Sequence, residues 1–137
     1  NSTSSSPIPP LDQHLQAHGI KLSLAYLAVH EAFAKHGLPA PLPAQAGVFV
    51  LLDWREALRT LASSKGHVVP SFHHEHQLWR LILDQANVNL TPGKDMGFHE
   101  AGWYRLCFGF CKQDVVKVAI ERIAHCFEKH GLLQTVT

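Results

Sequence analysis

The spacing of apolar residues along the chain predicts a small domain built from both helices and strands. Four segments repeat their apolar residues at intervals of three and four, which is typical of amphipathic helices: residues 11–36, 54–61, 72–87 and 113–130. Gly19 is expected to divide the first segment into a short helix and a longer one. Three segments rich in β-branched and aromatic residues predict strands: residues 48–52, a very short run at 88–90, and 103–110.

Two of the predicted helices end in nearly the same way. The first ends at AFAKHGLP and the last at CFEKHGLL, so Gly37 and Gly131 occupy equivalent positions. Glycine readily adopts the left-handed conformation that closes a helix, and an apolar contact usually accompanies it. Phe33 with Leu38, and Phe127 with Leu132, are placed to make that contact.

The order of these elements predicts an α/β fold. Two or three strands and four helices form one small layer of each kind. A sheet of this size is thin for an independent enzyme, and it suits a lobe that rests on a larger neighbour. Residues 1–10, NSTSSSPIPP, are rich in Ser and Pro and are expected to form a disordered tail or linker.

Composition and charge narrow the class of protein. The chain has 137 residues, which suits one domain, and a formal net charge of +1, which offers nothing to attract nucleic acid or anionic lipid. The longest apolar run, residues 46–52, is too short to cross a bilayer, and the first residues do not resemble a signal peptide. Three cysteines without metal spacing fit reduced thiols, so we expect a cytoplasmic protein. Without an initiator Met, the sequence is expected to be a piece of a longer chain.

Arg105 is the strongest candidate for a binding residue. Side chains alternate across a strand, so in residues 103–110 Tyr104 and Leu106 face one side while Arg105 and Cys107 face the other. A guanidinium in mid-strand is costly to bury without a partner, and its fork grips a carboxylate with two parallel hydrogen bonds. That carboxylate can belong to a ligand, or the arginine can form an internal ion pair or reach the surface.

Lysine and histidine candidates are weaker. Lys94 lies in a loop between two glycines, which offers none of the desolvation that a Schiff-base lysine needs, so we expect no catalytic role for it. His73 and His76 are three residues apart and could share a zinc ion, but no third ligand follows at a characteristic spacing. Solvated histidines are the expectation, with no metal site. The sequence also lacks a glycine-rich phosphate loop and a nucleophile elbow.

Three motifs carry a resemblance to a known family. AGVFVLLDWR, NLTPG and EAGWYRLCF, at residues 46–55, 89–93 and 100–108, resemble the C-terminal small domain of fold-type I pyridoxal-phosphate enzymes. The likeness is strongest to 1-aminocyclopropane-1-carboxylate synthases and class I aminotransferases, and it covers about residues 11 to 133. Ala101 stands where that group usually has proline, and Gly109 where it has alanine or serine.

The resemblance implies a fold and a role for this chain. Residues 11–137 would form the C-terminal small domain, a mostly antiparallel sheet of two to four strands covered by helices, and Arg105 would bind the α-carboxylate of an amino-acid substrate. Pyridoxal 5′-phosphate and its Schiff-base lysine would be held mainly by a large domain of the same chain, which is absent here, and the parent would be a homodimer. This fragment alone would contain no catalytic or cofactor-binding residue and would be inactive. Transamination and elimination both stay open, as does a non-catalytic binding or interaction module derived from this fold.

Overall fold

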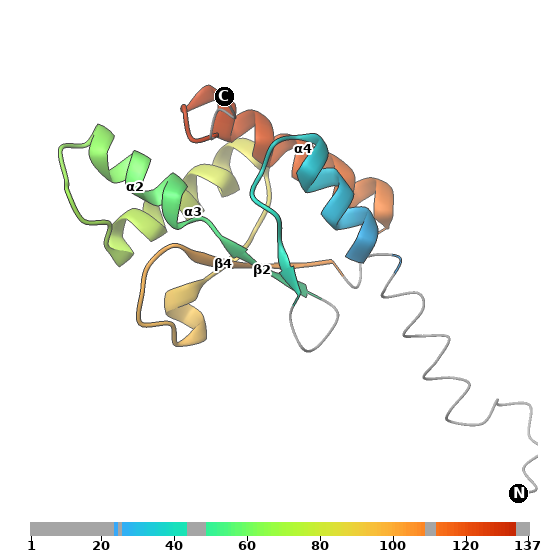
Figure 1. The fold of residues 1–137 in the computed structure, drawn as a ribbon, viewed down its shortest axis with the longest axis horizontal. Coiled ribbons are helices and arrows are strands. Elements are labelled where there is room, and N and C mark those ends of the chain that lie inside the picture. The colour runs from blue at the N-terminus through green and yellow to red at the C-terminus, as the bar shows by residue number, and fades with distance from the viewer. Residues whose placement is uncertain (1–23, 25, 44–48, 109–111, 134–137) are drawn as a thin grey trace, which may run out of the picture.

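The structure is a computed structural model that describes residues 24, 26–43, 49–108 and 112–133. A helix at residues 26–35 opens the described part, and strands and helices of the remaining chain follow it (Figure 1). These elements are β1 (Leu42–Pro43), β2 (Phe49–Asp53), α2 (Arg55–Ser64), α3 (Phe72–Ala86), β3 (Thr91–Pro92), the 3₁₀ helix η2 (Gly93–Met96), β4 (Trp103–Cys107) and α4 (Gln113–Lys129).

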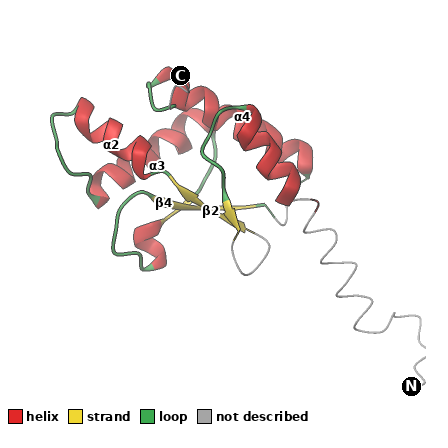
Figure 2. Ribbon diagram, in the orientation of Figure 1, coloured by secondary structure: helices red, strands yellow, loops and turns green. Residues whose placement is uncertain are grey.

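The strands form one four-stranded sheet in the order β1-β2-β4-β3, with every neighbouring pair antiparallel. Figure 2 shows the long helices gathered on one side of this sheet. The residues of β2 and β4 that point toward the helices are buried: Val50, Leu52, Tyr104 and Leu106. The residues between them are partly or fully exposed, so the sheet has one covered face and one open face. The predicted α/β class with a small antiparallel sheet is confirmed.

An aromatic cluster joins the covered face of the sheet to the helices. The ring of Trp54, at the end of β2, lies 5.2 Å from that of Tyr104 and 4.8 Å from that of Phe127 on α4. All three side chains are fully buried. Aromatic rings bury large apolar areas and gain further from tilted contacts, so this cluster fixes β4 against α4.

Both predicted helix ends are confirmed. Gly37 and Gly131 have φ values of 73° and 69°, in the left-handed region. The N–H of Leu38 donates to the carbonyl of Phe33 at 3.0 Å, and the N–H of Leu132 donates to the carbonyl of Phe127 at 2.8 Å. These bonds close each helix by the same motif, which sequence alone indicated.

Several boundaries differ from the sequence-based expectation. The short strand expected at residues 88–90 is wrong: those residues carry no strand, and β3 follows directly at Thr91–Pro92. Proline cannot donate to a sheet ladder, and β3 accordingly lies at the sheet edge. The strand β4 ends at Cys107, three residues before the expected end. The expected tail at 1–10, the break at Gly19 and the start of the first helix lie outside the described residues.

No helix in the described part of the chain is both long enough and apolar enough to span a bilayer.

Candidate functional site

Arg105 lies on the open face of the sheet, in the middle of β4. It pairs with Leu51 of β2 on one side and with Thr91 of β3 on the other. Its guanidinium Nη2 donates to Thr91 Oγ1 at 3.4 Å, and its Cζ atom lies 4.8 Å from the centroid of the Phe49 ring. The alternation predicted from sequence is therefore confirmed around Arg105, with Tyr104 and Leu106 buried on the opposite face.

Arg105 has no carboxylate partner among the residues that the structure describes. The ion pairs of arginine found there belong to Arg55, Arg59 and Arg80. The internal ion pair considered from sequence therefore has no support in this part of the chain. Arg105 is half-buried. The arrangement can accept an acidic group from outside the described residues.

Arg55, the first residue of α2, shows what an internally paired arginine looks like beside the same sheet. Its Nε and Nη2 donate to the two carboxylate oxygens of Asp53 at 2.8 and 2.9 Å, and its Nη1 donates to Glu100 at 3.2 Å. These bonds from Arg55 lower the pKa of the Asp53 carboxyl, outweighing the opposite effect of its partial burial. The same contacts raise the pKa of Arg55. Arg55 thus has two carboxylate partners, in contrast to Arg105.

The backbone beside Arg55 requires glycine at position 102. Gly102 has φ of 113°, and a Cβ atom there would lie 2.7 Å from Cγ of Arg55 and 2.9 Å from its Cα. The carbonyl of Gly102 accepts a hydrogen bond from the N–H of Trp54 at 2.9 Å. This close approach joins the end of β2 to the residue that precedes β4, and so sets where β4 begins.

Glu75 anchors the loop that leads into β4. Its side chain is only 1% exposed, and its two oxygens accept the backbone N–H groups of Gly102 at 2.9 Å and Lys94 at 3.1 Å. The hydroxyl of Tyr104 donates to the backbone carbonyl of Glu75 at 2.7 Å, and burial raises the pKa of Tyr104. One carboxylate thus holds both ends of the loop between η2 and β4.

Sequence reasoning missed Glu75, although a signal was present. The buried residues of α3 are spaced at three and four along one face, and Glu75 falls on that face: His74, Glu75, Leu78, Ile82 and Ala86. The apolar residues Phe72 and Trp79 of the same helix are only half-buried. A carboxylate on a buried face must find hydrogen-bond donors, and this requirement alone would have marked it.

The zinc hypothesis for His73 and His76 gains no third ligand. No group of three His, Cys, Asp or Glu side chains is placed to hold a metal ion anywhere in the described ranges. His76 instead packs its ring against Trp79, with centroids 5.2 Å apart. Between them, His74 is buried: its Nδ1 accepts the N–H of Ser71 at 2.9 Å, and its Nε2 lies 3.0 Å from Nδ1 of His67. His74 therefore forms a capping box with Ser71 at the start of α3.

The backbone of Lys94 has a structural role, whereas its side chain is exposed. It lies in η2, where its N–H donates to Glu75. A lysine that binds pyridoxal phosphate must be desolvated and held rigidly, and Lys94 offers neither condition. Lys94 therefore does not fit the role of a cofactor-binding lysine, and the expectation that a large domain holds the cofactor stays a prediction.

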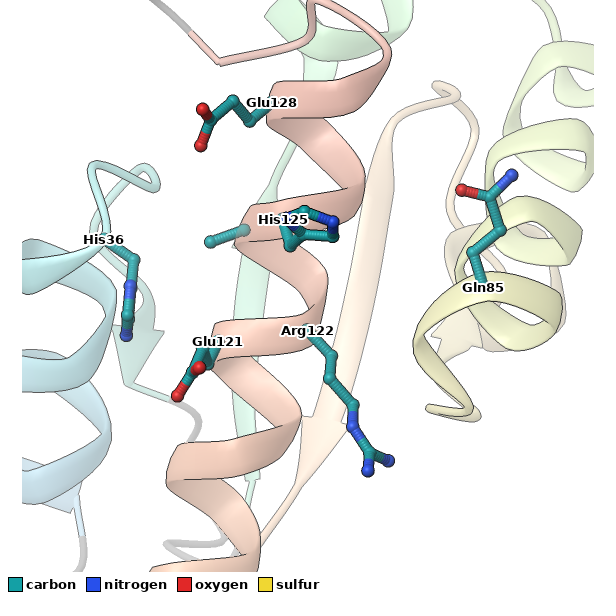
Figure 3. Close-up of a pocket in the computed structure, with 7 residues that line it drawn as sticks. His36, Gln85, Glu121, Arg122, His125 and Glu128 are labelled. Carbon is teal, nitrogen blue, oxygen red and sulfur yellow. The ribbon is translucent and has the colours of Figure 1, made fainter.

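One cavity lies beside α4, away from Arg105. It has a volume of about 480 Å³, and none of its lining residues belongs to the sheet. Figure 3 shows α4 running between His36 on one side and Gln85 on the other, with Glu121 and Arg122 pointing to opposite sides. A smaller cavity of about 240 Å³ is lined by Trp79, Pro92 and their neighbours. Arg105 lines neither of these two cavities and lies on the partly exposed face of the sheet.

Comparison with known proteins identifies the class. The sequence model of "Aminotransferase class I and II" matches residues 13–123, so the chain belongs to this family, and the resemblance seen in its motifs is confirmed. A solved aromatic aminotransferase from Pyrococcus horikoshii shares the fold, with a TM-score of 0.59 over 81% of this chain and 25% of that protein, at 18% identity.

The chain is also similar to curated 1-aminocyclopropane-1-carboxylate synthases. The chain is 31% identical over 117 residues to 1-aminocyclopropane-1-carboxylate synthase CMW33 of Cucurbita maxima. This match covers 85% of this chain and 22% of the relative. It is 37% identical over 82 residues to 1-aminocyclopropane-1-carboxylate synthase 6 of Arabidopsis thaliana, covering 60% of this chain and 15% of the relative. The chain thus spans about a fifth or less of the length of these relatives.

Proposed function

We propose that this chain is the substrate-carboxylate-binding lobe of a pyridoxal-phosphate-dependent enzyme that acts on amino acids, either an aminotransferase or a 1-aminocyclopropane-1-carboxylate synthase-like enzyme. Arg105 is the binding residue. The observation that carries the proposal is a half-buried guanidinium on the open sheet face with no carboxylate partner among the described residues. Membership of the aminotransferase family makes an amino-acid carboxylate the natural partner.

The chemistry of the pair suits this task. A guanidinium and a carboxylate are both planar, and two parallel hydrogen bonds between them fix direction as well as distance. An amino acid held in this way has its Cα atom at a fixed position relative to the sheet. Fixing a reacting group by a remote contact lowers the entropic part of the barrier.

The cofactor and the reacting lysine belong to residues outside this chain in this proposal. Pyridoxal phosphate supplies, when bound, the electron sink that permits cleavage of a bond at Cα. A larger domain of the same protein would hold it and cover the open face, and the longer protein would form a homodimer. Residues that decide between transamination and elimination would also lie there. A cytoplasmic location stays a prediction.

Substitution of Arg105 tests the proposal in a protein where this lobe is joined to its cofactor domain. Arg105→Lys keeps the charge but loses the fork, so we expect kcat/KM for the amino acid to fall by roughly 10- to 100-fold, the value of a charge-assisted hydrogen bond. Arg122→Lys is the matched control, because Arg122 is exposed on α4 and should leave kcat/KM unchanged. Equal kinetics in the Arg105 variant and the wild type would reject the proposal.

A non-catalytic binding or interaction module is the second candidate. It is favoured by the poor fit of the exposed Lys94 to a cofactor lysine. The visible absorbance of the purified 137-residue chain mixed with pyridoxal phosphate separates the possibilities. A stable, stoichiometric absorbance band that borohydride fixes onto one lysine would contradict the non-catalytic view, whereas we expect no such band.

A further inference from the structure

Arg105 in β4 and Arg55 at the start of α2 each lie against an aromatic ring, but their hydrogen-bond partners differ. Arg55 lies over the ring of Trp103, with Cζ 4.9 Å from the ring centroid, and Arg105 lies over the ring of Phe49 at 4.8 Å. Carboxylates hold the edge of Arg55, whereas the hydroxyl of Thr91 holds the edge of Arg105. Both guanidinium groups are thus oriented by an aromatic ring, but only Arg55 also has its charge balanced by carboxylates.

The contacts of Arg105 orient its charge without cancelling it. An aromatic face attracts a cation through its quadrupole, and a hydroxyl accepts one N–H, but neither carries a negative charge. The Phe49 ring lies against one flat face of the guanidinium, and the N–H donors point outward in the plane of the fork, where a carboxylate can meet them. That is the approach that gives two parallel hydrogen bonds.

Both contacts come from strands that flank β4. Thr91 on β3 pairs directly with Arg105, and Phe49 on β2 pairs with Cys107, which places it on the diagonal to Arg105. Diagonal neighbours on one face of an antiparallel sheet are within reach of aromatic and long side chains. The sheet ladder therefore fixes the distance between these three side chains, and a site on strands is held more closely than one on loops.

We infer that Phe49 and Thr91 are positioning residues, which present the guanidinium of Arg105 edge-on to a carboxylate. This inference rests on the proposed function, since it concerns the same guanidinium. Phe49 sets the plane of the fork and Thr91 sets its rotation within that plane. Neither residue needs to touch the ligand.

The wild-type spectrum tests the stacking before any substitution. In a chain labelled with ¹⁵N, the Arg105 side-chain Hε and Hδ signals should be displaced by the ring current of Phe49 relative to those of exposed Arg122. Acetate is the probe for the carboxylate, and the Arg105 Nε–Hε signal reports its binding. Phe49→Leu should remove the displacement and raise the dissociation constant for acetate about two- to fivefold. Phe49→Tyr keeps a ring, so the displacement of the Arg105 signal and the dissociation constant for acetate should both stay near their wild-type values.

Two further variants complete the design. Thr91→Val keeps the shape, removes the hydroxyl and should raise the dissociation constant about twofold, since the bond it removes is long. Trp103→Leu removes the equivalent ring beneath Arg55, so it is the matched control and should leave the Arg105 signal and acetate affinity unchanged.

The outcomes distinguish a failure of positioning by Phe49 from a failure of carboxylate binding by Arg105. If Arg105→Gln binds acetate as tightly as wild type, the proposed function fails. If Arg105→Gln abolishes binding while Phe49→Leu changes neither the signal nor the affinity, positioning by Phe49 is overturned and the function stands. Should Phe49→Leu not fold, the wild-type ring-current displacement still decides: its absence overturns the inference.

Discussion

The carboxylate of Glu75 accepts a hydrogen bond from the backbone N–H of Gly102 at 2.9 Å, in a site where Glu75 is 1% exposed. This bond joins the first turn of α3 to the residue just before β4. A second bond from the Lys94 N–H to the same carboxylate closes the loop between them. The position of Arg105 in β4 thus depends on a buried acid that lies on the covered side of the sheet.

Glu75→Gln should destabilise the fold. A glutamine has one acceptor oxygen and one amide donor, so one of the two backbone N–H groups would face another donor in a buried site. We expect the free energy of unfolding to fall by roughly 1–3 kcal/mol, measured by urea denaturation. Glu121→Gln, on the exposed face of α4, should change it by less than about 0.5 kcal/mol. Equal stability of the two variants would contradict the anchoring role.

Gly102→Ala should be more damaging than an ordinary glycine substitution. The added Cβ would lie 2.7 Å from Cγ of Arg55 in a backbone with φ of 113°, so strain and overlap act together. We expect the free energy of unfolding, measured by urea denaturation, to fall by roughly 2–4 kcal/mol. Gly66→Ala is the matched control, because Gly66 has φ of 81° but an added Cβ would meet no atom within 4 Å, and it should cost about 1 kcal/mol. Similar losses at both positions would show that close approach to Arg55 is unimportant.

Acidification should loosen the start of α3 through His74. Burial, followed by the charges of His67, His73 and Lys65, lowers the pKa of His74 below 6.5 in the folded chain. The unfolded chain then takes up the proton first, so the stability that neutral His74 contributes is present above pH 6.5 and is lost as the pH falls below it. The Nδ1 atom that accepts the Ser71 N–H is the atom that would have to be protonated.

Urea midpoints compared between about pH 7.5 and pH 5 measure this effect. The wild type should lose more stability than His74→Gln, whose amide oxygen can still accept the Ser71 N–H but cannot titrate. The difference between the two proteins isolates His74 from the other histidines. Parallel pH profiles would show that His74 does not link protonation to folding.

Local patterns predicted the parts of this fold that depend on short-range chemistry. The alternation of β4 placed Arg105 opposite Tyr104 and Leu106, because a strand has a fixed period of two. The glycine-ended helices were predicted correctly at Gly37 and Gly131 because a left-handed residue followed by an apolar contact is a local motif.

Long-range contacts determine the bounds of the short strands and the neighbours of Arg105, which local sequence patterns did not predict. Val88 and Leu90 are buried and apolar, yet the ladder begins one residue later at Thr91, where β4 offers partners. The two-residue strand β1 exists only because Leu42 and Pro43 meet β2. The supports of Arg105 come from both flanking strands, so no single segment of sequence could reveal Phe49 and Thr91 as its neighbours.

The most direct test of the account is a titration of the ¹⁵N-labelled chain with L-alanine, followed at the side-chain signals of its arginines. Binding at the open sheet face should move the Arg105 signal along a saturable curve, leave Arg122 in place, and disappear in Arg105→Gln. Signals of Arg105 and Arg122 that drift together without saturating, or an Arg105 signal that does not move, would contradict the assignment of this arginine to an amino-acid carboxylate.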